Sequence, residues 1–481
     1  MNKYLKKTKI IATLGPASSD KEVILQLIQA GADVFRINFS HADYDLVSRN
    51  VQMIRELNQE YGFSVGILGD LQGPKLRVGV VKEGSYLNPG DILTFTNEKI
   101  EGDSKMVYMT YQKFPQDVKA GERILIDDGK LVLEVLETNN IDTVRAKTIQ
   151  GGPLSSKKGV NLPNTNVSLP ALTEKDIEDA NFMLDLELDW IALSFVRHAQ
   201  DIIDLKEIMK NHPTNKHKTP IIAKIEKPEG VKNIEEILQE CDGLMVARGD
   251  LGVEVPMEEV PAIQKNLVEI ARKHSKPVII ATQMMETMIT SLTPTRAEVN
   301  DVANSVLDGA DAVMLSGETS VGRYPVDVVK NMSKIVKNIE QTHFYQTKNS
   351  PIEREFNCID ERFITNRVCL AAVRIAKSTN VEAIITLTYS GYTAFQISAH
   401  RPNSNIIVFS SNKRVLTMLN LLWGVRAYYY DMQKSTDETI VQVNMLAHTH
   451  GFVENGDFVI NLNATPAYEG GKTNTLRLTT I

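Results

Sequence analysis

The chain has 481 residues, which suggests roughly three domains at about 150 residues each. Its composition is that of an ordinary globular protein, and its formal charge of −7 argues against a general nucleic-acid binder. Three scattered cysteines are too few for a disulfide framework or a zinc cluster and fit a reduced, cytoplasmic compartment. The apolar stretch 10–14 is too short for a signal peptide and no run approaches a membrane span, so we expect a soluble protein without membrane contact.

Short runs rich in Ile, Val and Ala recur along the chain, and each is followed by a helix-like stretch. They lie at residues 8–13, 33–38, 64–70, 189–194, 220–226, 243–250, 277–282 and 311–316. Runs that are apolar at nearly every position indicate strands buried on both faces of a parallel sheet. Amphipathic patterns typical of helices lie between them, for example at 20–30, 256–274 and 295–307. Eight such units predict an α/β fold, a closed (β/α)8 TIM barrel built from residues 1–72 and 172–343.

Residues 73–171, between the third and fourth runs, follow a different pattern. They alternate in the manner of half-buried strands and contain few helix-period stretches. A hairpin is indicated at 124–133, where Asp128-Gly129 suits a type I′ turn. We therefore expect an inserted all-β domain, a small β barrel, and its place directly after a strand of the larger barrel suggests a lid over the active site.

The alternation of strands and helices resumes in the C-terminal part, residues 344–481. The polar stretch 342–354 contains Pro351 and reads as a linker. Strands are predicted at 382–388, 405–409, 425–430, 457–462 and 474–478. This pattern predicts a smaller α/β domain, which we interpret as regulatory.

The ends of the eight runs carry the chemistry of the chain. In a (β/α)8 barrel the catalytic groups lie at the C-terminal ends of the strands. Here those ends are charged or polar: Arg36, Asn38 and Ser40; Asp70; Ser194; Lys224 and Glu226; Arg248 and Asp250; Thr282; Ser316 and Glu318. Any one of them can be an ordinary solvated loop residue, but the whole set predicts an active site.

Two carboxylates, Glu226 and Asp250, follow adjacent strands and can share one ion. Two hard oxygens, completed by water and phosphate, suit Mg²⁺, and no cysteine or histidine cluster offers a softer site. The alternative is a structural salt bridge to a neighbouring base. A strongly cationic pocket that binds phosphate is predicted beside this ion, formed by Arg36, Arg77, Lys224 and Arg248.

Nine short segments, spread in order over the first 325 residues or so, carry a resemblance to one family. They lie at 12–18 (ATLGPAS), 36–41 (RINFSH), 73–74 (GP), 158–163 (KGVNLP), 224–226 (KIE), 245–252 (MVARGDLG), 281–284 (ATQM), 294–298 (PTRAE) and 315–319 (LSGET). The chain resembles the pyruvate kinases, of the bacterial type without an extra C-terminal extension domain. The family's C-terminal domain is matched more loosely.

The resemblance implies transfer of the phosphoryl group of phosphoenolpyruvate to ADP, giving pyruvate and ATP, the last step of glycolysis. Lys224 matches the lysine that bridges the phosphoryl group and the enolate oxygen, and Glu226 and Asp250 match the ligands of Mg²⁺, for which Mn²⁺ can substitute. The loop expected to receive the substrate carboxylate consists of Arg248, Gly249 and Asp250. The group expected to protonate the enolate carbon consists of Thr282, Ser316 and Glu318.

The resemblance also implies a nucleotide site and a monovalent-cation site. Arg36 and Arg77 would hold the transferring phosphate oxygens. The nucleotide positions are matched by Thr13, Pro16, Arg36, Asn38, His41, Arg77, Lys158 and Lys175, although His41 alone can equally be a surface residue that caps a helix. The positions of the potassium ligands are matched by Asn38, Ser40, Asp70 and Leu71.

The potassium site is only partly present. Leu71 stands where potassium-dependent members carry a threonine, Gln72 where they carry a lysine, and Lys75 where they carry a glutamate. The ammonium of Lys75 can occupy roughly the place of the ion. The sequence therefore resembles the potassium-independent branch, unless Lys75 simply points to solvent.

The loop that resembles the family's effector-phosphate site lies between a strand and a helix of the C-terminal part and carries Thr388, Ser390, Gly391 and Thr393. The family's lysine or glutamate is absent there and no arginine follows Ala464-Thr465-Pro466, which predicts a monophosphate effector. The alternative is a simple strand-to-helix turn. Homotetramer assembly is implied by the resemblance alone.

Two other functions fit the same barrel. One is a catalytically silent scaffold that binds a phosphometabolite, and it predicts the loss of one or more of four residues that are all present, Lys224, Glu226, Asp250 and Thr282. The other is a different phosphoenolpyruvate or oxoacid enzyme, such as a metal-dependent aldolase, which does not require the β insertion. Both explain fewer of the motifs than the kinase does.

Overall fold

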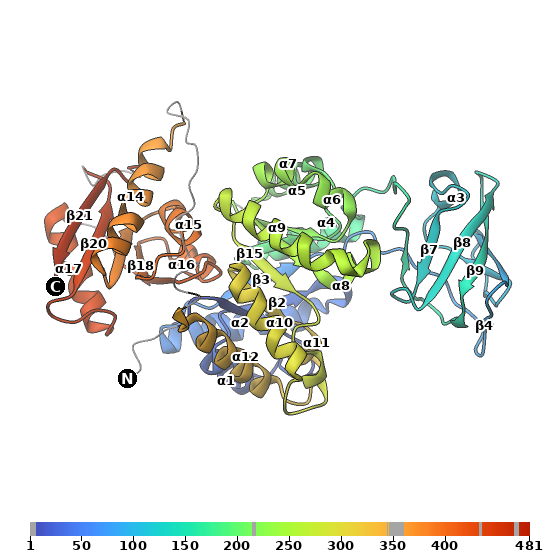
Figure 1. The fold of residues 1–481 in the computed structure, drawn as a ribbon, viewed down its shortest axis with the longest axis horizontal. Helices are drawn as coiled ribbons and strands as arrows, with labels where there is room; N and C mark the ends of the chain where they lie inside the picture. Colours follow the sequence, from blue (N-terminus) through green and yellow to red (C-terminus); the bar gives the residue numbers. More distant parts are fainter. Residues whose placement is uncertain (1–5, 214–217, 344, 346–359, 432–434, 466–470) are drawn as a thin grey trace.

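The structure is a computed structural model that describes all residues except 1–5, 214–217, 344, 346–359, 432–434 and 466–470. Figure 1 shows three bodies in a row, with the large barrel in the middle. The β strands of the segment 73–171, which we call the insertion, lie on one side of it, and the C-terminal sheet lies on the other.

The eight predicted strands form a closed, parallel barrel, which confirms the prediction. The strands are β1 (Lys9–Thr13), β2 (Val34–Asn38), β3 (Gly66–Asp70), β12 (Trp190–Leu193), β13 (Ile221–Ile225), β14 (Gly243–Ala247), β15 (Val278–Ala281) and β16 (Ala312–Leu315). They pair in the order β1-β16-β15-β14-β13-β12-β3-β2, and the register Lys9↔Ala312 between β1 and β16 closes the ring. Both faces of each strand are covered, which is why the runs are apolar without alternation.

Helices surround this barrel, and their ends follow local capping signals. The longer ones are α1 (Lys21–Ala30), α2 (Tyr44–Tyr61), α4 (Glu174–Asp185), α5 (Ala199–Lys210), α9 (Val260–Lys273), α10 (Arg296–Asp308) and α12 (Pro325–Glu340). Asp20 caps α1, and Thr295 with Glu298 forms a capping box on α10. Short helices lie between them: η1 (Phe39–His41), α6 (Pro228–Lys232), α7 (Ile234–Glu240), α8 (Arg248–Glu254), η2 (Met257–Glu259), η3 (Glu286–Ile289) and α11 (Gly317–Ser320).

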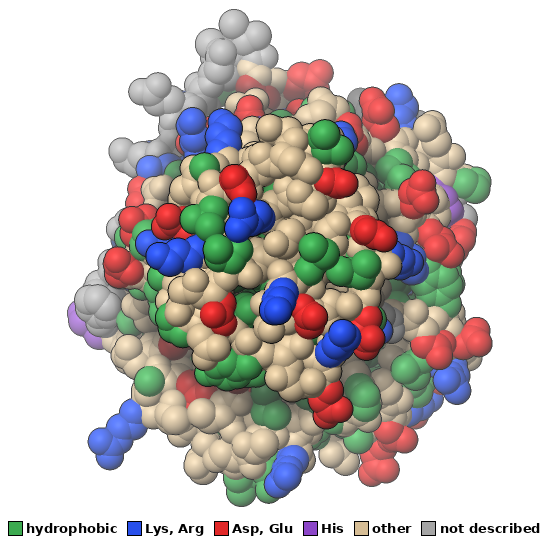
Figure 2. Space-filling model, turned by 90° about the vertical axis from the view of Figure 1, so that its right-hand side faces the viewer, with side chains coloured by type: hydrophobic (Ala, Val, Ile, Leu, Met, Phe, Trp, Pro, Cys, Tyr) green, Lys and Arg blue, Asp and Glu red, His purple; other side chains and the backbone are tan. Residues whose placement is uncertain are grey.

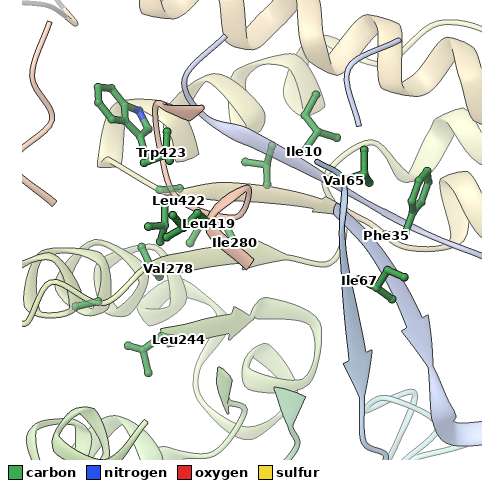
Figure 3. Packing of buried hydrophobic residues seen from close by; sticks show 14 of the residues in the cluster. Ile10, Phe35, Val65, Ile67, Leu244, Val278, Ile280, Leu419, Leu422 and Trp423 are labelled. Atoms are coloured by element: carbon green, nitrogen blue, oxygen red, sulfur yellow. The ribbon is translucent and has the colours of Figure 1, made fainter. Parts of the chain in front are cut away.

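The barrel core continues into the C-terminal part. Figure 3 shows Leu419, Leu422 and Trp423 beside the barrel residues Val278 and Ile280, and all of them belong to one buried hydrophobic cluster. Trp423 is 1% exposed, and its backbone N–H donates to the carboxylate of Asp311. The C-terminal part is therefore packed on the barrel.

The insertion has its own core. Its elements are β4 (Tyr86–Leu87), β5 (Ile92–Thr96), β6 (Met106–Tyr108), α3 (Phe114–Asp117), β7 (Arg123–Ile126), β8 (Leu131–Thr138), β9 (Thr143–Gln150), β10 (Gly152–Pro153) and β11 (Val160–Asn161). Six of them form a sheet in the order β11-β7-β8-β9-β5-β6, and β10 pairs with β4. Figure 2 looks onto this end of the molecule, where acidic, basic and hydrophobic side chains are mixed. The sheet thus buries one set of alternating positions and exposes the other, as the sequence pattern indicates.

The predicted hairpin is present, and its turn agrees with the prediction. Ile126 pairs with Leu131, and the N–H of Lys130 donates to the carbonyl of Asp127 at 3.2 Å, so Asp128 and Gly129 are the two central residues of the turn. Both adopt the positive φ that a type I′ turn requires, 56° and 83°. The carboxylate of Asp127 accepts from Lys130 and pairs with Lys158.

The C-terminal part is an α/β unit whose strands confirm the five predicted ones. They are β17 (Ala383–Leu387), β18 (Asn405–Ser410), β19 (Val425–Tyr429), β20 (Phe458–Asn463) and β21 (Thr475–Thr480), in the order β19-β18-β17-β20-β21. Only β21 is antiparallel to its neighbour. Helices α14 (Phe363–Thr379), α15 (Tyr392–Ala399), α16 (Lys413–Leu419) and α17 (Thr436–Thr449) connect or cover them. Most of the predicted linker 342–354 lies outside the described residues.

Among the residues that the structure describes, no helix combines the length and the apolar character that crossing a membrane would require.

Candidate active site

The barrel gathers the polar strand ends at one mouth, because all eight strands run in the same direction. The insertion leaves the barrel at this mouth, directly after β3, and returns to it before α4. A cleft between the two bodies is lined from the insertion side by Lys75, Asp128 and Asn161 and from the barrel side by Lys227 and Asp250. Of the candidate site residues, Asp250 and Lys75 line this cleft.

Lys224, on β13, is the centre of the site. Its Nζ lies 3.1 Å from Asp70 Oδ1 and 3.0 Å from Glu226 Oε1, and it donates to Ser194 Oγ at 2.6 Å. Burial lowers the pKa of Lys224, but Asp70 and Glu226 outweigh burial, so the pKa is raised above its ordinary value. The ammonium is thus charged and fixed in direction at neutral pH.

Arg36, on β2, forms the second cationic group. Its Nε donates to Asp70 Oδ2 at 2.6 Å, and its guanidinium also donates to Thr13 Oγ1 at 3.2 Å. Burial would raise the pKa of Asp70, but the charges of Lys224 and Arg36 hold it below its ordinary value. One buried carboxylate, on β3, therefore aligns two cations that come from β2 and β13.

Glu226 and Asp250 fit a divalent cation. Glu226 Oε2 accepts the N–H of Phe195 at 2.8 Å. The pKa of Glu226 is raised, first by burial and then by the charge of Asp250, while Lys224 opposes the shift. Two carboxylates that repel each other beside a cleft provide the hard oxygen donors that Mg²⁺ prefers, with water and substrate oxygens completing the shell. No cluster of three or more His, Cys, Asp or Glu side chains suited to a metal occurs among the described residues.

The first turn of α8, which follows β14 directly, is held by Thr282. The N–H of Gly249 donates to Thr282 Oγ1 at 2.7 Å, and this hydroxyl donates to the carbonyl of Ala281 at 2.6 Å. Thr282 has a φ of 68°, a conformation that is costly for a β-branched residue. The backbone of Gly249 is thereby fixed close to the threonine, and such strain is characteristic of functional sites.

The side chain of Arg248 does not join Lys224 and Arg36. It makes a two-pronged ion pair with Asp301, at 2.6 and 2.7 Å, and donates to the carbonyl of Thr282 at 2.8 Å. The predicted pocket of four bases therefore stays a prediction for this side chain, whose guanidinium pairs with Asp301 on α10. Arg248 instead anchors the start of α8, the helix that carries Asp250.

Ser316 and Glu318 close the loop after β16. Glu318 is 3% exposed and accepts the N–H of Ser316 at 2.7 Å and that of Met285 at 3.1 Å. Among the described contacts no hydrogen bond joins these residues to Thr282. The relay expected from the three therefore stays a prediction.

The residues expected near the nucleotide are dispersed around the mouth. Thr13 and Pro16 follow β1, where Gly15 packs so closely that a Cβ there would lie 2.6 Å from the carbonyl oxygen of Ser320. On the insertion, Lys158 pairs with Asp127 at 2.9 Å and Arg77 donates to the carbonyl of Lys157 at 3.2 Å. The described contacts do not link Arg77 to Arg36 or Lys224.

The two remaining residues expected near the nucleotide are Lys175 and His41. Lys175 pairs with Asp179 and donates to the hydroxyl of Tyr44 at 2.8 Å. Burial lowers the pKa of Lys175, but Asp179 and Tyr44 raise it further, so its net pKa lies above the ordinary value. The side chain of His41 lies outside the described residues.

The four groups of the monovalent-cation site have protein partners here. Asn38 Oδ1 accepts from Ser40 Oγ at 2.9 Å, Asp70 pairs with the two cations described above, and the carbonyl of Leu71 accepts from Ser194 Oγ at 2.7 Å. Lys75 is exposed and borders the cleft. A Cβ on Gly159 would lie 3.7 Å from Lys75 Cε, so this lysine lies against the returning strand of the insertion.

The loop proposed for an effector is closed by its own hydroxyls. Thr388 Oγ1 accepts the N–H of Gly391 at 3.0 Å, and Thr393 Oγ1 bonds to Thr473 Oγ1 at 2.8 Å. Gly391 has a φ of 83°, and a Cβ there would lie 2.9 Å from the side chain of Leu419. Ser390 is exposed. Of the three hydroxyls, that of Ser390 is thus the most accessible.

Two residues take part in the candidate active site although the sequence assigned them no role there. Ser194 stands among the polar strand ends, but only the structure shows that it orients Lys224. Asp301 lies in the middle of α10, and no sequence signal distinguishes it from other helix-surface acids. Both depend on contacts between distant segments.

Comparisons with known proteins agree over the whole chain. The family model described as "Pyruvate kinase, barrel domain" matches residues 5–329, and that described as "Pyruvate kinase, alpha/beta domain" matches residues 366–479. A pyruvate kinase of Mycobacterium intracellulare is 41% identical over 482 residues, which covers 98% of both chains. "Pyruvate kinase 2" of Synechocystis is 42% identical over 99% of this chain and 79% of its own length.

The fold gives the same result. A crystal structure of a pyruvate kinase from Cryptosporidium parvum superposes with a TM-score of 0.91 at 35% identity and covers 99% of this chain and 96% of that one. Two family models, close relatives and a solved structure therefore agree with the geometry at the mouth of the barrel. The chain belongs to the pyruvate kinase family.

Proposed function

We propose that this chain transfers the phosphoryl group of phosphoenolpyruvate to ADP and releases pyruvate and ATP. The observation that carries the proposal is the position of Lys224, a buried ammonium held by Asp70, Glu226 and Ser194 at the mouth of the barrel. A fixed positive charge stabilises negative charge that develops on a phosphoryl group and an enolate oxygen. Arg36, aligned by the same Asp70, supplies a second charge beside it.

Glu226 and Asp250 would hold Mg²⁺, with Mn²⁺ as an alternative. Bound there, the divalent ion supplies positive charge next to the transferring phosphate oxygens. The residues of the chain orient the reactants: the loop with Arg248, Gly249 and Asp250 receives the substrate carboxylate, and Thr282 keeps that loop in place. Proton delivery to the enolate carbon is assigned to the group of Thr282, Ser316 and Glu318. The nucleotide is assigned to the residues around Thr13, Pro16, Asn38, His41, Arg77, Lys158 and Lys175.

The division of the chain follows the same logic. We assign catalysis to 1–72 and 172–343, a lid to 73–171 and regulation to 344–481. The lid assignment is supported by the cleft between insertion and barrel and by one contact across it. Asn161, on β11, donates to the buried Glu254 at 2.7 Å, and Lys227 donates to the same carboxylate at 2.5 Å. Closing such a cleft excludes water from phosphoryl transfer.

Potassium is not required in this proposal. Leu71 offers only a backbone carbonyl, which already accepts from Ser194, and Lys75 borders the cleft with a positive charge of its own. The effector is assigned to the exposed end of the loop 388–393. We also propose a cytoplasmic homotetramer, on the family's precedent.

A coupled assay tests the proposed activity. The enzyme is given phosphoenolpyruvate and ADP with Mg²⁺, and pyruvate formation is followed through NADH oxidation by lactate dehydrogenase. Pyruvate and ATP are expected in equal amounts, and neither is expected without the divalent ion. An enzyme that binds phosphoenolpyruvate but forms no pyruvate would be the silent scaffold, and cleavage or condensation of an oxoacid would indicate an aldolase.

A further inference from the structure

The four residues after β12 contact both the insertion and the candidate catalytic residues of the barrel. The proposed mechanism requires these two parts to keep a fixed relative position. Ser194 Oγ accepts from Lys224 and Phe195 N–H donates to Glu226, so the start of this loop, residues 194–197, holds the central lysine and a candidate metal ligand. Phe195 has a φ of 55°. This strained backbone turns the end of the loop, Arg197, toward the insertion.

Arg197 holds the segment by which the insertion returns to the barrel, residues 167–169. Its two terminal nitrogens donate to the carbonyls of Val167 and Leu169. The residue between them, Ser168, faces the other way: its N–H and its hydroxyl donate to Asp117 of the insertion at 2.8 and 2.9 Å. The segment 167–169 is therefore held by the barrel at alternate positions and by the insertion at the position between.

The charged guanidinium of Arg197 donates its hydrogen bonds to these two carbonyls. In the described part of the chain no carboxylate forms an ion pair with its guanidinium, and its Nε is buried without a hydrogen-bond partner. A guanidinium is planar and presents its donors in a fixed fork, so it can hold two carbonyls of one strand where an ammonium holds them less rigidly.

The segment by which the chain leaves the barrel for the insertion contacts the same loop. Gly73 has a φ of 70°, and a Cβ there would lie 2.8 Å from Cδ2 of the Phe195 ring. Both connections between insertion and barrel therefore contact residues 194–197. A rotation of the insertion about these connections has to displace the loop that orients Lys224 and Glu226.

We propose that Arg197 is a positioning residue that couples the orientation of the insertion to the placement of Lys224 and Glu226. The proposal rests on the proposed function, because it assigns the coupling to that same site. Arg197 lines the cleft, as Asp250 does, but no described contact joins it to Lys224, Glu226 or Asp250. It acts through Ser194 and Phe195, three and two residues before it on one short loop.

The test compares Arg197→Met, Arg197→Lys and the control Arg145→Met, whose wild-type side chain pairs with Glu137 on the surface of the insertion. Arg197→Met is expected to lower kcat about ten- to a hundredfold, since small misplacements of catalytic groups have effects of that size. It is also expected to raise the Mg²⁺ concentration for half-maximal rate, with the melting temperature nearly unchanged. Arg197→Lys should recover part of both losses, and Arg145→Met should match the wild type.

A double-mutant cycle tests whether Arg197 and Ser168 act through the same segment, residues 167–169. Because Ser168→Ala weakens the insertion side of the same segment, its effect on kcat should not add to that of Arg197→Met. Solution scattering of Arg197→Met should show a broader range of molecular dimensions than the wild type. Wild-type kcat and Mg²⁺ dependence in Arg197→Met, or fully additive effects in the cycle, would overturn the proposal.

The outcome is separable from that of the proposed function. A wild-type enzyme without activity in the coupled assay would refute phosphoryl transfer, whereas scattering would still report whether Arg197 fixes the insertion. Unchanged scattering of Arg197→Met in that case would also refute the proposal that Arg197 fixes the orientation of the insertion.

Discussion

Lys224 illustrates how the site uses a buried charge. Three oxygen partners surround its ammonium within 3.1 Å, and two of them are carboxylates, of which Asp70 also pairs with Arg36. Burying a charge is costly unless it is paired, so this arrangement is stable only as a group. The same group keeps the ammonium fixed before substrate arrives, which is what electrostatic stabilisation of a transition state requires.

Replacing Lys224 by methionine should reduce kcat by about two to three orders of magnitude, the scale found when one preorganised charged or polar group is removed. The melting temperature should also fall, because Asp70 and Glu226 lose their partner. The measurement is the coupled assay together with calorimetry. Lys206→Met is the control, since Lys206 pairs with Glu240 outside the site at 2.7 Å. A Lys224→Met enzyme with most of its turnover would contradict the assigned role.

Lys75 should make potassium unnecessary. The rates of the wild type are expected to be nearly equal in potassium and in a large quaternary ammonium salt at matched ionic strength. Lys75→Glu should lose activity without potassium and regain part of it when potassium is added. The reason is that the carboxylate removes the positive charge of the ammonium, which an external cation then has to supply. Lys82→Glu, on the insertion surface, controls for the change of charge. A wild type that is nearly inactive until potassium is added would refute this prediction.

At the scale of elements, the loop before α15 is where the sequence predicts an effector phosphate. Thr388 and Thr393 close this loop from inside, and at its outer end lie the exposed Ser390 and the N–H of Tyr392, which donates to Ser390 Oγ at 3.5 Å. Such N–H groups together with a hydroxyl suit one phosphate. Among the described residues, this loop has no basic side chain that could bind a second phosphate.

The loop should therefore bind monophosphates better than bisphosphates. Isothermal titration with AMP, ribose 5-phosphate and fructose 1,6-bisphosphate should give a weaker affinity for the bisphosphate, and Ser390→Asp should abolish monophosphate binding by repulsion. Ser378→Asp, on the outside of α14, serves as the control. Much tighter binding of the bisphosphate than of both monophosphates would count against the prediction.

At the scale of the whole molecule, a buried ionic cluster joins the barrel to the C-terminal part. Asp33, 5% exposed, pairs with Lys6, lies 3.9 Å from Lys9 Nζ and lies 3.6 Å from the guanidinium of Arg426. Burial would raise the pKa of Asp33, but the three cations hold it below its ordinary value. Burial lowers the pKa of both lysines despite their partner.

Asp33→Asn should lower the thermal stability markedly, because removing one partner of a buried ionic group costs about 3–5 kcal/mol. Since the folded pKa of Asp33 lies below the ordinary 3.8, its stabilisation is present above that pH and is lost as the pH falls through the folded value. Circular dichroism melts should therefore show a difference between wild type and variant that is constant from about pH 7 to about pH 5 and shrinks toward about pH 3. The exposed pair of Asp437 with Arg477 provides the control, Asp437→Asn. A difference that grows on acidification would be inconsistent with this assignment.

The sequence by itself determined the barrel and predicted the members of its site. A parallel strand covered on both faces must be apolar throughout, so each of the eight strands is visible without knowledge of its neighbours. The chemistry of Lys224, Glu226 and Asp250 is visible for a related reason, because charge directly after such a strand has to lie at the mouth of the barrel.

Only the tertiary structure decided what these residues contact. Arg248 pairs with Asp301 from another helix, Ser194 joins Lys224 to Leu71, and Arg197 holds the segment 167–169 of the insertion. Asp127, beside the hairpin turn, likewise pairs with Lys158 from another segment. The strand pattern is local and fixed by burial, whereas partner choice depends on which distant segments the strand order and the helix directions bring within hydrogen-bond distance.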